Sequence, residues 1–142
     1  MKKSSFDMLK LENQLCFPLY AAAKEVISKY RPFLADLDLT YTQYIVMMVL
    51  WEEKSINVKK IGDMLYLDSG TLSPLIKSLE KKGYVYKLRA EYDERVVEII
   101  LTPKGEEIKN QAKDIPMKIG SCINLEPEEA KILYKLLYKM LK

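Results

Sequence analysis

Three successive helix start signals in the middle of the chain limit the folds open to it. The first lies at residues 40–43, where a threonine and a glutamine three residues later have the spacing of a capping box before an apolar stretch. Asn57 can cap a short second helix, and Asp68 can cap a third helix that ends at Gly83. Apolar residues recur at helical spacing after each start, so the sequence predicts three consecutive helices.

Two runs of β-branched and aromatic residues follow the third helix, at residues 84–88 and 96–101. Their partial alternation predicts the two strands of a hairpin, and the charged residues 89–95 between them predict its tip. Three helices followed by a hairpin is the order of a winged helix-turn-helix, in which the third helix enters the major groove of DNA. The expected fold is therefore mainly α-helical with a small β-hairpin wing.

Amphipathic segments flank this unit on both sides. Residues 9–29 place apolar side chains at helical spacing, and Pro18 within them predicts a kink or a new helix start. Thr102 and Pro103 open another helix after the wing. Residues 126–129 open the last helix, whose apolar stripe is broad.

The flanking helices have apolar stripes wider than a small winged domain needs, which predicts that they pair two copies in a homodimer. The alternative is that they pack only on their own subunit. We expect one domain over residues 1–142, in which residues 1–36 and 103–142 form the dimerisation helices and residues 37–102 form the winged helix-turn-helix.

A dimer of this kind would place its recognition helices about 34–36 Å apart, so the expected partner is double-stranded DNA carrying an inverted-repeat operator. The hairpin tip has a net charge of −1, so affinity for DNA would rest on a few individually positioned cations. Asp93 is expected to pair with Arg95 and so orient the arginine side chain. The alternative is a winged domain that binds only protein. The residues expected at the DNA are Ser69, Gly70, Thr71, Ser73, Pro74, Lys77, Arg89, Asp93 and Arg95.

Composition excludes several classes of function. The chain has no histidine and only two cysteines, which removes histidine-based catalysis and a four-ligand zinc site. We expect no metal, no cofactor and no enzymatic activity. The longest apolar stretch, residues 44–51, is far shorter than the roughly 20 residues that cross a bilayer, so we expect a cytoplasmic protein that does not contact the membrane. The net charge of +3 permits binding to DNA without demonstrating it.

The run Leu67–Leu75, followed by Asp93-Glu94-Arg95 and Leu101-Thr102, resembles the MarR family of dimeric winged-helix transcriptional regulators. The segment Leu11–Tyr20 is similar to the branch of organic-hydroperoxide repressors, and the resemblance covers nearly the whole chain. It implies a repressor that binds DNA when reduced and releases it when an amino-terminal cysteine is oxidised by organic hydroperoxide.

The same resemblance implies roles for individual residues. Cys16 matches the reactive cysteine, and Tyr20, Tyr30 and Tyr41 match tyrosines near it, of which Tyr30 and Tyr41 would hydrogen-bond the thiolate from the partner subunit. Some members of the branch have a single sensing cysteine, and others have a second that closes an intersubunit disulfide; Cys122 matches this resolving cysteine. The alternatives are that both cysteines are small buried hydrophobes and that the tyrosines are ordinary core residues.

Sensing requires a thiolate, whereas a thiol of pKa about 8.5 is only roughly 3% ionised at pH 7. A helix start at residues 17–18 would place Cys16 at the positive end of a helix dipole. Because a lower thiol pKa also lowers nucleophilicity, ionisation alone gains only about two- to threefold in rate, so positioning and hydrogen-bond donors must supply the rest. Other functions stay open: a regulator released by a small phenolic ligand, a broader oxidative-stress or virulence regulator, and a thiol peroxidase.

Overall fold

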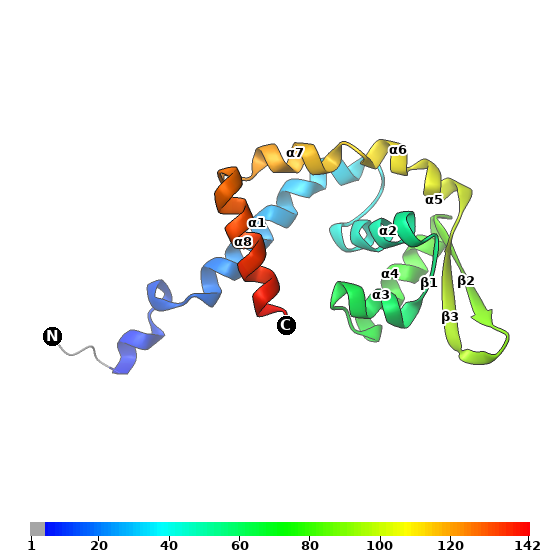
Figure 1. Ribbon diagram of the computed structural model, residues 1–142, viewed down its shortest axis with the longest axis horizontal. Coiled ribbons are helices and arrows are strands. Elements are labelled where there is room, and N and C mark those ends of the chain that lie inside the picture. Colours follow the sequence, from blue (N-terminus) through cyan, green and yellow to red (C-terminus); the bar gives the residue numbers. More distant parts are fainter. Residues whose placement is uncertain (1–4) are drawn as a thin grey trace.

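The computed structural model describes residues 5–142 and is mostly helical, with one small antiparallel sheet (Figure 1). Helices α2, α3 and α4 and the sheet form one end of the molecule, while α1, α7 and α8 form the other (Figure 1). The elements in chain order are η1 (Ser5–Leu9), η2 (Leu11–Asn13), α1 (Cys16–Ala35), α2 (Tyr41–Glu53), β1 (Ser55–Asn57), α3 (Val58–Leu65), α4 (Ser69–Lys81), β2 (Val85–Ala90), β3 (Asp93–Leu101), α5 (Pro103–Glu107), α6 (Lys109–Ala112), α7 (Ile115–Cys122) and α8 (Pro127–Met140).

Helix α2 is the centre of the core. Its capping box forms as predicted, because the Gln43 backbone N–H donates to Thr40 Oγ1 at 3.3 Å and the Thr40 N–H donates to Gln43 Oε1 at 3.0 Å. More than one face of α2 is covered, and its buried residues are Gln43, Tyr44, Val46, Met47, Val49, Leu50 and Trp51. The helix therefore contacts α1, α3 and α4 together.

Both predicted caps of the helix-turn-helix are present. Asn57 Oδ1 accepts a hydrogen bond from the Lys60 N–H at 2.8 Å, and Asp68 Oδ1 accepts one from the Thr71 N–H at 2.7 Å. The chain turns after α4 at Gly83, whose φ of 83° lies in the left-handed region that favours glycine. Three apolar residues of α4 face the core, Leu72, Ile76 and Leu79.

The hairpin differs from its prediction. Pairing of β2 with β3 continues to Ala90 and Asp93, so only two residues form the turn, and the expected seven-residue tip is wrong. Backbone hydrogen bonds between strands do not require apolar side chains, so the charged residues join the ladder. The sequence also missed β1, which pairs with β3 to give the strand order β1-β3-β2.

The first long helix also differs from its prediction. It begins at Cys16 rather than near residue 9, and Pro18 lies in its first turn, where the missing backbone N–H has no intrahelical partner to lose. The expected new start near Pro18 is therefore confirmed. The helix was expected to end near residue 29, yet it continues through Pro32 to Ala35.

The helix expected after Thr102 begins as predicted but is divided into α5, α6 and α7. Thr102 Oγ1 accepts a hydrogen bond from the Gly105 N–H at 3.0 Å, which caps α5. Pro116 lies in the first turn of α7 and marks the last of these breaks. Helix α8 begins at Pro127, as residues 126–129 predicted, and the Glu126 N–H donates to Glu129 Oε1 at 2.9 Å.

Helix α8 has no buried residue in the single chain, although its sequence is amphipathic. The amino-terminal segment likewise exposes large apolar side chains. Residues 1–4 of the expected dimerisation segment lie outside the described residues. No helix within residues 5–142 has the length and apolar character to span a membrane. The exposed apolar residues of these two regions are Phe6, Met8, Leu9, Leu11, Leu15, Phe17, Leu19, Ile132, Leu133, Leu136, Met140 and Leu141.

Candidate DNA interface and thiol site

Most side chains on the face of α4 that points away from the core are small and polar. Asp68 caps the helix with a carboxylate whose pKa is lowered mainly by the hydrogen bond from the Thr71 backbone. The cap is therefore charged above the ordinary Asp pKa and is lost only as the pH falls through the lowered value. All the α4 residues expected at the DNA are exposed: Ser69, Gly70, Thr71, Ser73, Pro74 and Lys77.

A groove of about 720 Å³ lies between this helix, α3 and the wing. Asp68, Ser69 and Ser73 line it from the side of α4. Cations line it from α3 and the wing: Lys59, Lys87, Arg89 and Arg95. Lys59 and Lys87 were missed by the sequence analysis, although the spacing of Lys87 and Arg89 two residues apart on β2 places both on one face of the strand.

The wing contains the predicted pair of opposite charges. Arg95 Nε donates to Asp93 Oδ1 at 3.1 Å and Arg95 Nη2 donates to Asp93 Oδ2 at 3.2 Å, so the guanidinium binds the carboxylate with two hydrogen bonds. These hydrogen bonds lower the pKa of Asp93. The Arg95 side chain is 90% exposed and is oriented without being covered. Arg89 Nη1 donates to the Glu94 carbonyl at 2.8 Å across the turn.

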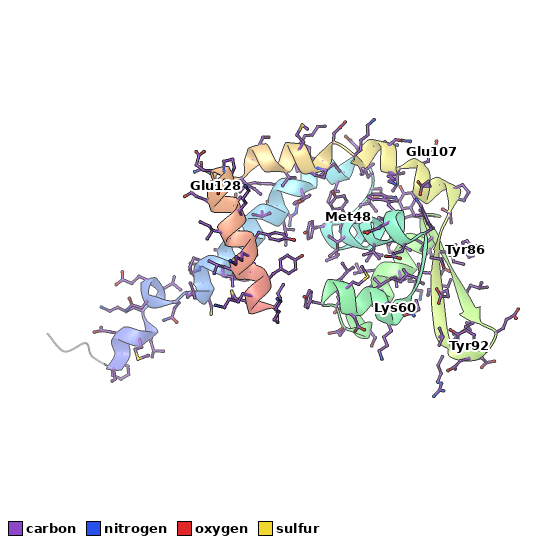
Figure 2. The ribbon with its side chains drawn as sticks, viewed as in Figure 1. Met48, Lys60, Tyr86, Tyr92, Glu107 and Glu128 are labelled. Carbon is purple, nitrogen blue, oxygen red and sulfur yellow. The ribbon has the colours of Figure 1, made fainter. Side chains whose placement is uncertain are left out.

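The tip of the wing extends past the helices (Figure 2). Tyr92 lies in the turn, and Lys60 lies on the outer side of α3 toward the same edge of the molecule (Figure 2). Glu128, at the start of α8, is at the opposite end (Figure 2). The exposed cations of α3 and the wing are thus gathered at the end that presents α4, away from the flanking helices.

Both cysteines are exposed in the single chain. Cys16 is the first residue of α1, with no side-chain cap before it, and Cys122 is the last residue of α7. Cys16 therefore lies at the positive end of a helix dipole, as the position of Pro18 suggested. The alternative that both cysteines are buried hydrophobes is wrong for this protomer.

Two of the three predicted tyrosines lie together at the junction of α1 and α2. The ring centroids of Tyr30 and Tyr41 are 4.8 Å apart. Burial raises the pKa of each. The Tyr41 hydroxyl raises the pKa of Tyr30 further, and the Tyr138 hydroxyl of α8 raises that of Tyr41, so both stay protonated at neutral pH. Tyr20 does not join them, because it is 60% exposed and the Lys24 ammonium lies 5.2 Å from its ring centroid.

A third tyrosine, Tyr44, belongs to this cluster and was not predicted. Its ring centroid lies 5.7 Å from that of Tyr30 and 6.3 Å from that of Tyr41. The sequence carried a signal for it, since Tyr41 and Tyr44 are three residues apart and share one side of α2. Tyr30, Tyr41 and Tyr44 are called the tyrosine cluster below.

Known proteins resemble the chain over most of its length. The family profile described as transcriptional regulator SarA/Rot matches residues 28–112. The organic hydroperoxide resistance transcriptional regulator of Bacillus subtilis is 45% identical over 140 residues, which cover 99% of this chain and 95% of that protein.

Solved structures agree with this result. Reduced AbfR bound to DNA, from Staphylococcus epidermidis, matches at 33% identity with a TM-score of 0.79, covering 95% of this chain and 94% of that one. The disulfide form of AbfR matches at 32% identity with a TM-score of 0.66, covering 96% of each chain. A cysteine-to-serine mutant of MarR from E. coli on operator DNA shares the fold, at 23% identity and a TM-score of 0.78, covering 99% of this chain and 100% of that one.

The capped helices α3 and α4, the wing beside them and these matches agree with one another. The expected winged helix-turn-helix with a small wing is confirmed. The chain belongs to the SarA/Rot transcriptional regulators, DNA-binding proteins of the MarR type.

Proposed function

We propose that this protein is a homodimeric repressor that binds an inverted-repeat operator when reduced and releases it when organic hydroperoxide oxidises Cys16. The observation that carries the proposal is that one chain exposes a thiol at the start of α1 and holds Tyr30 and Tyr41 together where the end of α1 meets α2. The strong similarity to an organic hydroperoxide regulator and to the reduced, DNA-bound form of AbfR supports it.

The geometry of α1 favours a site shared between two subunits. Cys16 and Tyr30 are fourteen residues apart on one helix, which places them about 21 Å apart along its axis. A thiolate from one copy can therefore meet the tyrosine cluster only in a second copy. The uncovered apolar residues of α8 and of the amino-terminal segment supply a surface for that pairing. Residues 1–36 and 103–142 would form it, with residues 37–102 as the DNA-binding unit.

The oxidation has two steps. The Cys16 thiolate attacks the outer peroxide oxygen, so that an S–O bond forms, the O–O bond breaks and the alcohol leaves after taking a proton. The product is a sulfenic acid on Cys16. Condensation with the Cys122 thiol of the partner subunit would then form an S–S bond and release water. If the two Cα atoms start more than about 7 Å apart, closing this bond must move α1 and α7, and so change the spacing of the two α4 helices.

An electrophoretic shift assay on an inverted-repeat fragment tests the proposal. Reduced protein is expected to retard the fragment, cumene hydroperoxide to release it, and dithiothreitol to restore binding. Retention of the fragment after Cys16 is fully oxidised would contradict the proposed function.

Arg95→Ala is expected to weaken operator binding by about 10- to 100-fold and to lower the slope of affinity against salt by about 1, because an oriented arginine at the wing is lost. Fluorescence anisotropy at several salt concentrations measures both quantities. Lys113→Ala is the control, since Lys113 is exposed away from the groove, and we expect less than a twofold change. Equal losses of operator affinity in the two variants would show that Arg95 makes no specific contact with the DNA.

The partner thiol is tested on a non-reducing gel. After one equivalent of cumene hydroperoxide, the wild-type chain is expected to run as a covalent dimer, whereas Cys122→Ser is expected to run as a monomer. A wild-type chain that stays monomeric while Cys16 is oxidised would exclude the intersubunit disulfide and leave a one-cysteine mechanism.

A second candidate function rests on the groove beside α4. Its volume of about 720 Å³ falls in the range of small-molecule sites, so a phenolic ligand there would block the DNA-binding surface directly. Release of the operator from Cys16→Ser by such a ligand, without peroxide, would favour this function over thiol sensing.

A further inference from the structure

Tyr44 is held more firmly than any other member of the tyrosine cluster. It is only 3% exposed, and its ring lies against Tyr30 and Tyr41 on one side. The ring of Trp51 meets it edge-on at 6.3 Å. Trp51 is fixed in turn, because its Nε1 donates to the Gly105 carbonyl at 2.9 Å. The phenol of Tyr44 therefore has one well-defined position.

The hydroxyl of Tyr44 has no hydrogen-bond partner among the described residues, unlike that of Tyr84, which donates to the Leu37 carbonyl at 3.1 Å. Within residues 5–142 no fully enclosed polar side-chain atom is left unpaired. The Tyr44 oxygen must therefore reach the surface, although its ring is buried. A buried ring whose hydroxyl is not enclosed can donate a hydrogen bond to a group outside the protomer.

The hydroxyls of Tyr30 and Tyr41 lie close enough to Tyr44 to affect its titration. Burial raises the pKa of Tyr44, and the hydroxyls of Tyr30 and Tyr41 raise it further. All three phenols consequently keep their protons at neutral pH and act as donors. Tyr30 and Tyr41 are each partly exposed, whereas Tyr44 lies deepest.

We propose that Tyr44 is a third donor of the thiol site and hydrogen-bonds the leaving oxygen of the hydroperoxide. The inference rests on the proposed function and deepens it. Tyr30 and Tyr41 would donate hydrogen bonds to the attacking sulfur. The more deeply buried Tyr44 hydroxyl would donate to the leaving oxygen. As the S–O bond forms and the O–O bond breaks, the alkoxide takes the phenolic proton and leaves as the alcohol, and Tyr44 recovers a proton from water. Donors aimed at developing negative charge stabilise the transition state directly.

Tyr44→Phe in the full-length chain separates this role from a structural one, because it removes only the hydroxyl. We expect the rate of Cys16 oxidation by cumene hydroperoxide to fall at least about 10-fold, a typical effect of losing a donor to a developing oxyanion. The rate of Cys16 alkylation by iodoacetamide and the Cys16 thiol pKa derived from its pH dependence should stay unchanged, since that reaction expels iodide. Tyr86→Phe, an exposed tyrosine on β2, is the control and should change neither rate.

Three results would overturn the inference. An unchanged peroxide rate in Tyr44→Phe would remove the donor role, and an equal fall in the peroxide and alkylation rates would show that Tyr44 acts only on the thiolate or on packing. Tyr30→Phe and Tyr41→Phe, which should raise the Cys16 thiol pKa, report on the proposed function separately. If wild-type Cys16 reacts with hydroperoxide no faster than free cysteine, both the proposed function and the inference fail.

Discussion

Cys16→Ser is expected to bind the operator as tightly as the wild-type protein and to keep it bound in excess cumene hydroperoxide. Cys16 is exposed at the first position of α1, so the substitution changes neither the core nor the exposed face of α4. A serine hydroxyl does not ionise near neutral pH and does not attack peroxide, so the whole response should disappear. The shift assay with and without peroxide measures both properties.

Cys122→Ser is the matched control for this prediction, because it removes the other exposed thiol of the chain. Its Cys16 should still be oxidised by peroxide to sulfenic acid, although the variant cannot form the intersubunit bond. Peroxide release from Cys16→Ser equal to that from the wild-type protein would assign sensing to another group.

Gly105→Ala is expected to lower the free energy of unfolding by about 3 kcal/mol, the upper end of ordinary overpacking effects. A Cβ at this position would lie 2.2 Å from the Tyr84 carbonyl oxygen and 2.8 Å from Leu101 Cδ1. The backbone cannot easily withdraw, because the Gly105 N–H donates to Thr102 Oγ1 at 3.0 Å and its carbonyl accepts from Trp51 Nε1 at 2.9 Å. The close approach joins the start of α5 to the base of the wing.

Denaturant unfolding at one fixed protein concentration measures this loss, since the stability of a dimer depends on concentration. Gly70→Ala is the matched control, because a Cβ there meets only Asp68 Oδ1 at 3.5 Å, an ordinary contact. Alanine favours the helix by up to about 1 kcal/mol, so the control should be as stable as the wild type or slightly more stable. Similar losses in the two variants would mean that the contact at Gly105 relaxes without cost.

Local signals predicted the three helices of the helix-turn-helix unit well. The caps at Thr40, Asn57 and Asp68 are interactions within three residues, so the sequence alone specifies them. Once those starts are known, helical spacing separates the buried side of α4 from its exposed side.

Features that depend on distant partners were predicted less well. Strand β1 pairs with residues about forty positions away in β3, and nothing in its three residues signals a strand. The first helix was expected to end near residue 29, yet α1 continues past Pro32, with Leu34 buried in the core. Tertiary packing outweighed the local preference of proline in this case.

Only part of the thiol site could be predicted from the sequence. Tyr30 and Tyr41 were named through a family resemblance, and the structure brings them together. Tyr44 was missed because a tyrosine on the covered side of a central helix is usually a core residue, and the structure places its ring against those of Tyr30 and Tyr41. The residues of a second subunit that would complete the proposed site depend on pairing that local patterns do not encode.

The most direct test of the central claim follows operator binding and Cys16 chemistry in the same samples. Wild-type protein bound to an inverted-repeat fragment is titrated with less than one equivalent of cumene hydroperoxide, and each sample is divided between an anisotropy reading and mass spectrometry of the Cys16 peptide. The account predicts that the fraction of operator released rises in step with the fraction of Cys16 oxidised. Release while Cys16 remains a free thiol, or full oxidation of Cys16 with the operator still bound, would contradict it.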